Sequence, residues 1–79
     1  MKFYYDGELI RTSKTHNYTH AVVAPARWPE AKNKWVTYGC RTGLQGAQAL
    51  LNDTKRRMGA YNKKTAELLR IVELEAREK

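Results

Sequence analysis

The first dozen residues form two short strand-like runs that predict a β-hairpin. Residues 2–5 (KFYY) favour a strand and are followed at once by Asp6-Gly7. An Asp-Gly pair between such runs predicts a two-residue turn, because both turn positions need positive φ. This turn gives four cross-strand pairs: Tyr5–Glu8, Tyr4–Leu9, Phe3–Ile10 and Lys2–Arg11. Because like charges repel when they lie opposite each other, we expect the face of Lys2 and Arg11 in solvent and that of Phe3 in the core.

Two later runs predict a third and a fourth strand. YTHAVVA (residues 18–24) alternates in strand fashion, and WVTYGC (residues 35–40) is rich in β-branched and aromatic residues. In the fourth strand, alternation predicts one shared face for Val36, Tyr38 and Cys40. The segment between the two runs, residues 25–34, has two prolines and no periodicity, which predicts a loop.

From Thr42 onward the chain contains no proline and many helix-forming residues. Thr42, followed three residues later by Gln45, predicts a capping box at the start of a helix. The helical seam recurs at spacings of three and four: Leu44, Ala47, Leu51, Thr54, Met58, Tyr61, Thr65, Leu68 and Val72. This pattern predicts a long amphipathic C-terminal helix, with Gly59 as the candidate break if there are two helices instead.

One helix of this length would overhang the sheet. About 36 residues make a helix about 54 Å long, whereas a sheet of four short strands is about 20 Å across. Its overhanging end would expose an apolar group: Leu68, Leu69, Ile71, Val72 and Leu74. Either the chain folds back near Gly59 or this end packs on a second subunit. We expect the second, a homo-oligomer whose interface contains Leu68, Leu69 and Val72.

These elements predict an α+β fold. A small antiparallel sheet, made of the N-terminal hairpin plus two strands, is followed by the long C-terminal helix. A chain of 79 residues forms one domain with a small core. We therefore expect a single domain over residues 1–79, with a β-sheet part at 1–41 and a helical part at 42–79.

Composition excludes several kinds of protein. Cys40 is the only cysteine, which rules out an internal disulfide and disfavours a zinc cluster. The apolar runs are far shorter than the ~20 residues that span a bilayer, and no signal-peptide pattern is present. We expect a cytoplasmic protein with no membrane partner.

The chain is basic, and its charge is uneven. It has 15 Lys and Arg against 8 Asp and Glu, for a net charge of +7. Residues 1–62 carry ten cations and four acids, whereas residues 63–79 carry five and four. Positive potential of this kind favours nucleic acid, nucleotides or an acidic protein surface, although it also serves solubility.

No pattern in the chain predicts catalysis or a bound metal. Cys40 has no spacing relation to His16 or His20 that would indicate a nucleophile and its base. In a strand, the spacing of His16 and His20 puts them about 13 Å apart, too far to share a metal. No paired carboxylates and no glycine-rich phosphate loop occur. We expect a non-enzymatic protein without catalytic residues, metal or cofactor.

The stretch RTSKTHNYTH, residues 11–20, is dense in hydrogen-bonding side chains. Arginine, lysine and hydroxyl donors suit phosphate oxygens, and Tyr4, Tyr18 and Trp28 could stack on bases. The predicted anion-binding residues are Lys2, Tyr4, Arg11, Ser13, Lys14, Thr15, His16 and Tyr18. A solvated strand–turn–strand has the same composition, so both interpretations stay open.

A second basic cluster lies on the predicted helix, beside its seam. It consists of Lys55, Arg56 and Arg57. It could serve as a secondary basic patch for the same ligand. An ordinary solvated helix face explains it equally well.

The opening YYDGELIRTSKTHNYTHAVV resembles the start of small accessory proteins of bacteriophages and prophages. Those combine a short glycine-turn hairpin with a Leu-(Ile/Val)-Arg-Thr-Ser-Lys stretch and a Tyr-x-x-Ala-Val strand. The matching positions here are Gly7, residues 9–14 and residues 18–22, about the first third of the chain. The resemblance implies an accessory phage gene turned against host defence, acting by binding in the cytoplasm of the bacterial host.

Three functions remain open from the sequence. In the first, the basic hairpin face binds phosphates of a nucleic acid or of a signalling nucleotide. In the second, the same surface blocks a host defence protein by direct contact, as inhibitors of CRISPR nucleases do. The third is a structural or assembly protein that acts through its helix.

Overall fold

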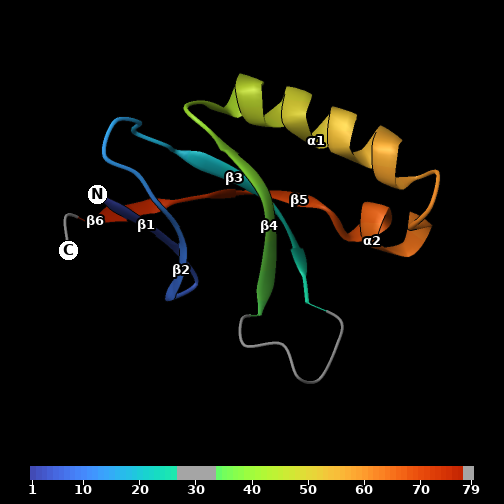
Figure 1. Cartoon of the computed structure of the whole chain (residues 1–79), viewed down its shortest axis with the longest axis horizontal. Helices are drawn as coiled ribbons and strands as arrows, with labels where there is room; N and C mark the ends of the chain where they lie inside the picture. Colours follow the sequence, from blue (N-terminus) through green and yellow to red (C-terminus); the bar gives the residue numbers. More distant parts are fainter. Residues whose placement is uncertain (27–33, 78–79) are drawn as a thin grey trace.

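The computed structural model describes residues 1–26 and 34–77, which form two three-stranded antiparallel sheets and two helices (Figure 1). In chain order the elements are β1 (Lys2–Tyr5), β2 (Glu8–Thr12), β3 (His20–Pro25), β4 (Trp35–Arg41), α1 (Leu44–Met58), α2 (Lys63–Leu68), β5 (Arg70–Glu73) and β6 (Glu75–Arg77). The hairpin sheet has the strand order β2-β1-β6, and the central sheet has the order β4-β3-β5.

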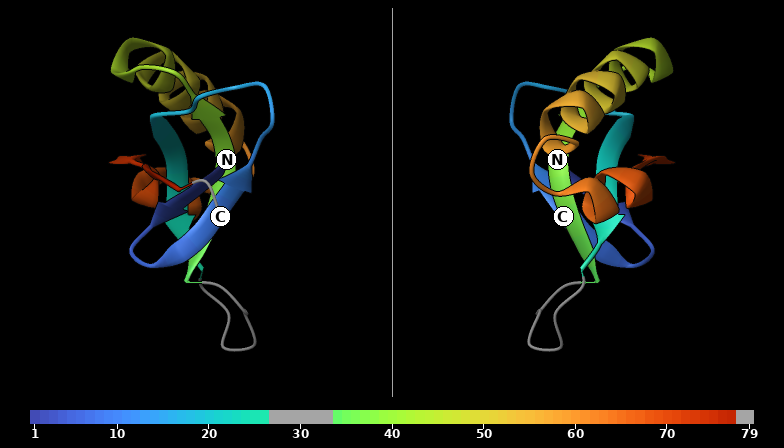
Figure 2. Two further views of the ribbon diagram at one scale, coloured as in Figure 1. Left: turned by 90° about the vertical axis from the view of Figure 1, so that its left-hand side faces the viewer. Right: turned by 90° about the vertical axis from the view of Figure 1, so that its right-hand side faces the viewer.

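The central sheet is covered on both faces. On one face, Val22 and Ala24 of β3 pack with Met58 at the end of α1 and with α2. On the other face, Val23 packs in a second cluster that Ile10 of the hairpin sheet also contacts. Because both its faces are covered, β3 is almost fully buried, and Figure 2 shows the helices and the hairpin on different sides of it.

The predicted hairpin is confirmed, but its register changes part of the way along. Asp6 and Gly7 have φ of 54° and 77°, as a two-residue turn of this kind requires. The first two predicted pairs are present; the register then shifts by one residue between Phe3 and Tyr4, leaving Ile10 without a partner in β1. The last two predicted pairs are therefore wrong: Phe3 lies opposite Arg11, and Lys2 lies opposite Thr12.

Strands β3 and β4 occur where the sequence predicts them. Their register also shifts, between Val22 and Val23, and Tyr38 is left without a partner. Tyr38 packs on the helix side of the sheet, while Cys40 lies in the cluster between the sheets. The predicted shared face of Tyr38 and Cys40 is therefore wrong. Most of the loop predicted at 25–34, with Trp28, lies outside the described residues.

Hydrogen bonds to Glu8 connect the hairpin to the central sheet. Its carboxylate accepts hydrogen bonds from the backbone N–H of Lys34 at 2.8 Å and of Trp35 at 3.3 Å. Beside it, the ring of Tyr5 meets that of Trp35 edge-on at 5.3 Å, and the Arg70 guanidinium lies 5.3 Å from the Trp35 ring. Two short strands cannot hold a hairpin alone, so these contacts fix its position.

The predicted fold class is wrong in both halves: the hairpin and the two later strands lie in separate sheets and not in one, and no long C-terminal helix forms. Helix α1 ends at Met58, and residues 59–61 form a turn. The Asn62 side chain then caps the short helix α2 by accepting a hydrogen bond from the Thr65 N–H at 3.4 Å. The predicted capping box also fails, since Gly43 is the N-cap of α1 and no side chain caps it.

The segment after α2 forms strands instead. Ile71 packs toward the helices and Val72 toward the hairpin sheet, which is the two-residue alternation of a strand buried on both faces. Strand β5 pairs with β3, and β6 continues into the hairpin sheet to pair with β1. The third strand satisfies the backbone of β3, which helical geometry at this point would leave unpaired.

The reason for expecting an interface at the C-terminal helix is therefore gone. Leu69 and Val72 are each 7 % exposed because they pack inside their own chain, and only Leu68 remains at the surface. The chain folds back after Gly59, which is the alternative that the sequence left open. Within the described ranges, no helix has both the length and the apolar character needed to cross a bilayer.

Candidate functional site

The register shift in the hairpin divides the predicted anion-binding residues between two faces. Cross-strand partners share a face, so Arg11 lies on the inner side with Phe3. Lys2 and Tyr4 alternate with Phe3 along β1 and lie on the outer side. The single patch predicted from the sequence is therefore two groups on opposite faces of the hairpin sheet.

Tyr18 is the centre of the inner group, which we call the Tyr18 cluster: Arg11, His16 and Tyr18. The Arg11 guanidinium carbon lies 5.7 Å from the centre of the Tyr18 ring, within cation–π range. The His16 ring stacks on Tyr18 at 5.4 Å with only 6° between the planes. Fully buried Phe3 supports the tyrosine edge-on at 5.5 Å, so the cluster rests on the core.

A hydrogen-bonded turn sets the position of His16. The Ser13 hydroxyl accepts from the backbone N–H of Thr15 at 3.3 Å and of His16 at 3.0 Å. Ser13 is itself held by two backbone hydrogen bonds to Met1, at 3.0 and 3.1 Å. Thr15 Oγ1 and His16 Nδ1 lie 3.0 Å apart, so the outer nitrogen, Nε2, is the one left for a ligand.

The charge of the Tyr18 cluster is not neutralised by any ion pair in the described part of the chain. The ion pairs there all involve Arg56, Arg57 or Arg77. Residues 9–19 contain no acid, and Lys14 in the same turn is exposed. Burial raises the pKa of the Cys40 thiol, and the nearby guanidinium groups of Arg11 and Arg41 partly oppose that rise.

His20 does not join this cluster. It lies opposite Arg41 on one side and Glu73 on the other, in the row of the central sheet next to that of Ala21. Because Ala21 faces the hairpin sheet, His20 faces the other way. The two histidines thus point to different surfaces, and the described residues contain no group of three or more side chains suited to a metal ion.

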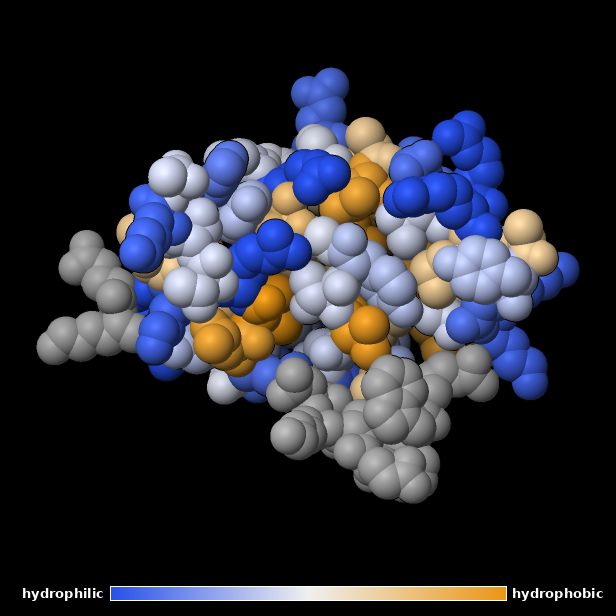
Figure 3. Space-filling view, viewed as in Figure 1, coloured by the Kyte–Doolittle hydropathy of each residue, from blue (hydrophilic) through white to orange (hydrophobic). Residues whose placement is uncertain are grey.

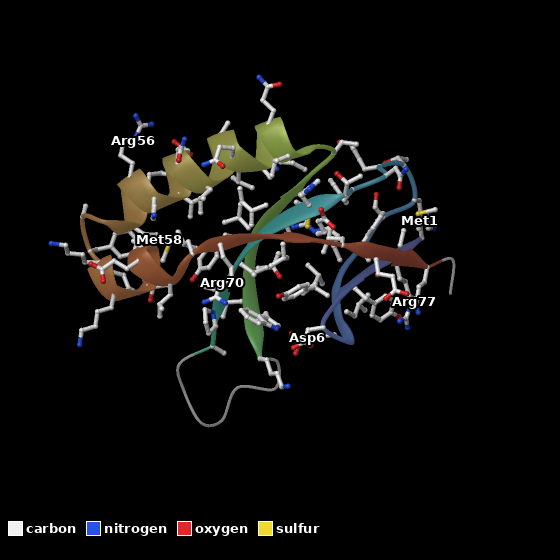
Figure 4. All side chains as sticks on the ribbon, turned by 180° about the vertical axis from the view of Figure 1, so that it is seen from behind. Met1, Asp6, Arg56, Met58, Arg70 and Arg77 are labelled. Atoms are coloured by element: carbon white, nitrogen blue, oxygen red, sulfur yellow. The ribbon has the colours of Figure 1, made fainter. Side chains whose placement is uncertain are left out.

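The outer group gains a residue that the sequence analysis missed. Arg77 of β6 lies opposite Lys2 and places its guanidinium 4.6 Å from the Tyr4 ring. Glu75 holds it with two hydrogen bonds, at 3.0 and 3.2 Å. Figure 4 shows Arg77 near Met1 at this end of the molecule. No local signal could reveal Arg77, because its role depends on β6 being a strand beside β1.

Two of the three cations in the secondary basic patch share one carboxylate, and Lys55 has no ion pair among the described residues. Asp53 binds Arg56 at 3.0 Å and Arg57 at 2.9 Å, which lie three and four residues further along the helix and therefore on the same face. All three cations lie in the last turn of α1, where positive charge favours the helix dipole. Figure 3 shows hydrophilic side chains along the upper edge of the molecule, where Figure 1 places α1. The helix dipole and Asp53 are a sufficient structural explanation for cations at this end of α1.

The Tyr18 cluster therefore offers donors that have no carboxylate partner in the described ranges on an ordered aromatic support, whereas Arg56 and Arg57 on α1 already share one carboxylate. Of the predicted residues, the structure brings together Arg11, His16 and Tyr18, with Ser13 and Thr15 shaping the turn. No protein-family model matches this chain, and neither a curated protein nor a solved structure matches it.

Proposed function

We propose that the protein is a non-enzymatic binding protein whose Tyr18 cluster holds phosphate groups of a nucleic acid or a nucleotide. The observation that carries this proposal is the contact of Arg11 and His16 with one tyrosine ring, beside a turn without acids. A guanidinium beside an aromatic ring and without a carboxylate partner keeps donors that match two phosphate oxygens at once.

The surrounding turn supplies further donors of the right kind. Lys14 can reach outward as a mobile point charge, and His16 Nε2 can donate a hydrogen bond. Because Arg11 has no carboxylate partner among the described residues, a ligand would not need to displace one.

The two faces of the hairpin sheet distinguish the two candidate ligands, a single nucleotide and a longer nucleic acid. A single nucleotide can use the Tyr18 cluster alone. A longer nucleic acid that passes over the hairpin could also meet Lys2 and the Tyr4–Arg77 pair on the outer face. We favour nucleic acid, because the outer face also presents an aromatic ring beside cations.

The setting we propose is that of the phage accessory proteins that the opening resembles. In that setting the protein would act in a bacterial cytoplasm against a host defence system. Binding of the nucleic acid or the nucleotide signal that the defence uses would be sufficient, so no catalysis is required.

The test is a binding titration of fluorescent oligonucleotides at two salt concentrations. We expect affinity to fall steeply with salt, by roughly one unit of log–log slope per neutralised phosphate for duplex DNA. Arg11→Ala with Lys14→Ala should weaken binding at least tenfold. The matched control is Lys63→Ala with Lys64→Ala, which removes the same charge from exposed positions of α2.

The same two double variants also define the results that would contradict the proposal. Equal losses in the two double variants would mean that net charge, and not the Tyr18 cluster, is responsible. Salt-independent binding, or no binding of oligonucleotides and cyclic nucleotides, would contradict the proposal outright.

The alternative is inhibition of a host defence protein by direct contact. One observation favours it: the outer face of the hairpin sheet exposes Leu9, which is 46 % accessible and lies opposite Tyr4. An exposed apolar side chain suits a protein surface better than it suits a polyanion. Leu9→Asp would then abolish capture of the host protein, while the Arg11 and Lys14 changes would leave it intact.

A further inference from the structure

A second candidate site lies at the other end of the molecule, where α1 ends. A hollow of about 290 Å³ opens between α1, β4 and the turn that follows α1. Its lining residues are Tyr38, Thr54, Arg57, Met58 and Tyr61. Figure 4 shows Met58 and Arg56 far from Met1 and Arg77, so this hollow is separate from the hairpin.

The floor of the hollow holds a polar group without a partner. Thr54 and Met58 are each 5 % exposed, and the Thr54 hydroxyl makes no hydrogen bond among the described residues. A threonine in a helix ordinarily bonds the carbonyl one turn earlier, so a free hydroxyl is costly here. Because Thr54 lines the hollow, a ligand bound there could supply the missing partner.

The walls and rim combine aromatic rings with a cation. Tyr38 forms a half-buried wall, and Tyr61 stands at the rim with 77 % of its surface exposed. Burial, and then the nearby phenol of Tyr61, raise the pKa of Tyr38. Arg57 uses one nitrogen, Nη2, for Asp53, which leaves further guanidinium donors.

The charge around the hollow favours an anion. Residues 53–64 contain five cations and one acid, Asp53. This excess outweighs the negative end of the α1 dipole, which lies at the same place. The volume is at the lower limit of the roughly 300–1,000 Å³ of ligand pockets, so the ligand must be small.

We propose that this hollow binds a small aromatic anion, with its ring against Tyr61, Tyr38 and Met58 and its anionic group on Arg57. A polar atom of the ring would take the free Thr54 hydroxyl as its partner. The same chemistry can come from two sources, an aromatic carboxylate or a nucleoside monophosphate. This site is independent of the Tyr18 cluster and gives Arg57 a role that its basic neighbours lack.

The experiment is a titration of the full chain with benzoate and, separately, with adenosine monophosphate, followed by amide NMR. We expect saturable shifts at Thr54, Met58 and Tyr61 with at least one probe. A response to benzoate alone or to the nucleotide alone identifies the source. The titration is repeated with Arg11→Gln, so that nucleotide binding at the Tyr18 cluster is not mistaken for binding here.

Three variants sharpen the result. Arg57→Gln should abolish saturation, whereas Arg56→Gln is the matched control, because Arg56 also binds Asp53 but does not line the hollow. Thr54→Val should weaken binding of adenosine monophosphate by about fivefold to tenfold, as loss of one hydrogen bond predicts, and should leave benzoate binding unchanged, because the benzoate ring has no polar atom. The same variant should raise the thermal midpoint of the free protein, since it removes an unpaired buried hydroxyl.

Two results would overturn the proposal. The first is no saturable shift at these amides with either probe up to several millimolar. The second is an equal loss of binding in Arg56→Gln and Arg57→Gln, which would show attraction to the general charge of α1 instead of a site.

Discussion

The molecule carries two basic clusters, one at each end, and they use their arginines differently. Arg11 lies against an aromatic ring and has no carboxylate partner among the described residues. Arg56 and Arg57 share the carboxylate of Asp53 on an open helix face, with 81 % and 66 % of their side chains exposed. In sequence the two clusters look alike, since each is a short run rich in cations.

The difference shows that the number of cations does not identify a binding site. A surface arginine that already has a carboxylate loses an interaction when a ligand arrives. An arginine held on a ring keeps its donors free and loses less rotational freedom on binding. Whether an arginine has a carboxylate or an aromatic ring as its partner is therefore better evidence for a binding role than the presence of the arginine alone.

The largest effect that we predict comes from removing the support of the Tyr18 cluster. Phe3→Ala deletes a side chain that is 0 % exposed and lies edge-on against Tyr18. We expect a loss of about 3–5 kcal/mol in the free energy of unfolding, measured with denaturant, because a large core residue is truncated. Arg56→Ala at the other end should change it by no more than about 0.5 kcal/mol.

In a chain this small, Phe3→Ala could unfold the protein altogether. Phe3→Leu fills most of the space and should fold, while still removing the aromatic contact. If Phe3→Leu bound oligonucleotides as tightly as the wild type, the cluster would not depend on the core in the way we describe.

The next effect concerns the ring itself. Tyr18→Ala removes one aromatic contact to Phe3, the stack with His16 and the cation–π contact with Arg11. We expect about 2 kcal/mol of destabilisation, since such contacts are worth roughly 0.5–1.5 kcal/mol each. Thermal unfolding measures it, and Tyr18→Phe is the control that should keep most of the stability and the binding.

The sequence predicts those parts of the fold in which the local pattern and the long-range packing favour the same structure. Asp6 and Gly7 fix a turn that needs no distant residue, and the hairpin is where they place it. The register shift between Phe3 and Tyr4 differs from this turn, because it depends on the packing of Ile10 against the central sheet. The sequence therefore predicts the hairpin but puts Arg11 on the wrong face.

The C-terminal segment shows the opposite case, in which a local signal misleads. Leu68 and Val72 continue a helical spacing, yet residues 70–73 also satisfy the two-residue period of a buried strand. What decides between them is the unpaired edge of β3, which lies about fifty residues earlier in the chain. The same long-range pairing brings Arg77 to Tyr4. Neither the strand at residues 70–73 nor the position of Arg77 could therefore be predicted from neighbouring residues in the sequence.

A smaller effect tests the comparison of the two ends directly. Asp53→Asn removes the carboxylate shared by Arg56 and Arg57. We expect less than about 1 kcal/mol of destabilisation, because exposed ion pairs contribute little. Oligonucleotide binding should increase and its salt dependence should steepen, since two cations lose their partner.

The increase in Asp53→Asn should vanish when Arg56 and Arg57 are also changed to Gln. If the salt dependence of oligonucleotide binding were unchanged in Asp53→Asn alone, the carboxylate would not be what keeps these cations from binding the oligonucleotide. The contrast between the two ends would then have to rest on the aromatic support alone.

The smallest effect concerns the thiol behind the Tyr18 cluster. Cys40 is 2 % exposed, and burial raises its pKa above the ordinary value of 9.0, with Arg11 opposing the rise. The native state thus holds this proton more tightly than the unfolded chain does. The resulting stability is complete below the ordinary thiol pKa and is lost as the pH rises from there through the native value.

We expect the denaturation midpoint of the wild type to fall with rising pH more than that of Cys40→Ala, which lacks the thiol. In Arg11→Gln the fall should be larger still, because the opposing charge is gone and the native pKa of Cys40 rises further. Alkylation of Cys40 should be slow until the protein unfolds. A wild type and a Cys40→Ala variant with the same pH dependence would show that the thiol titrates alike in both states, and fast alkylation of the native protein would show that it is not shielded behind Arg11.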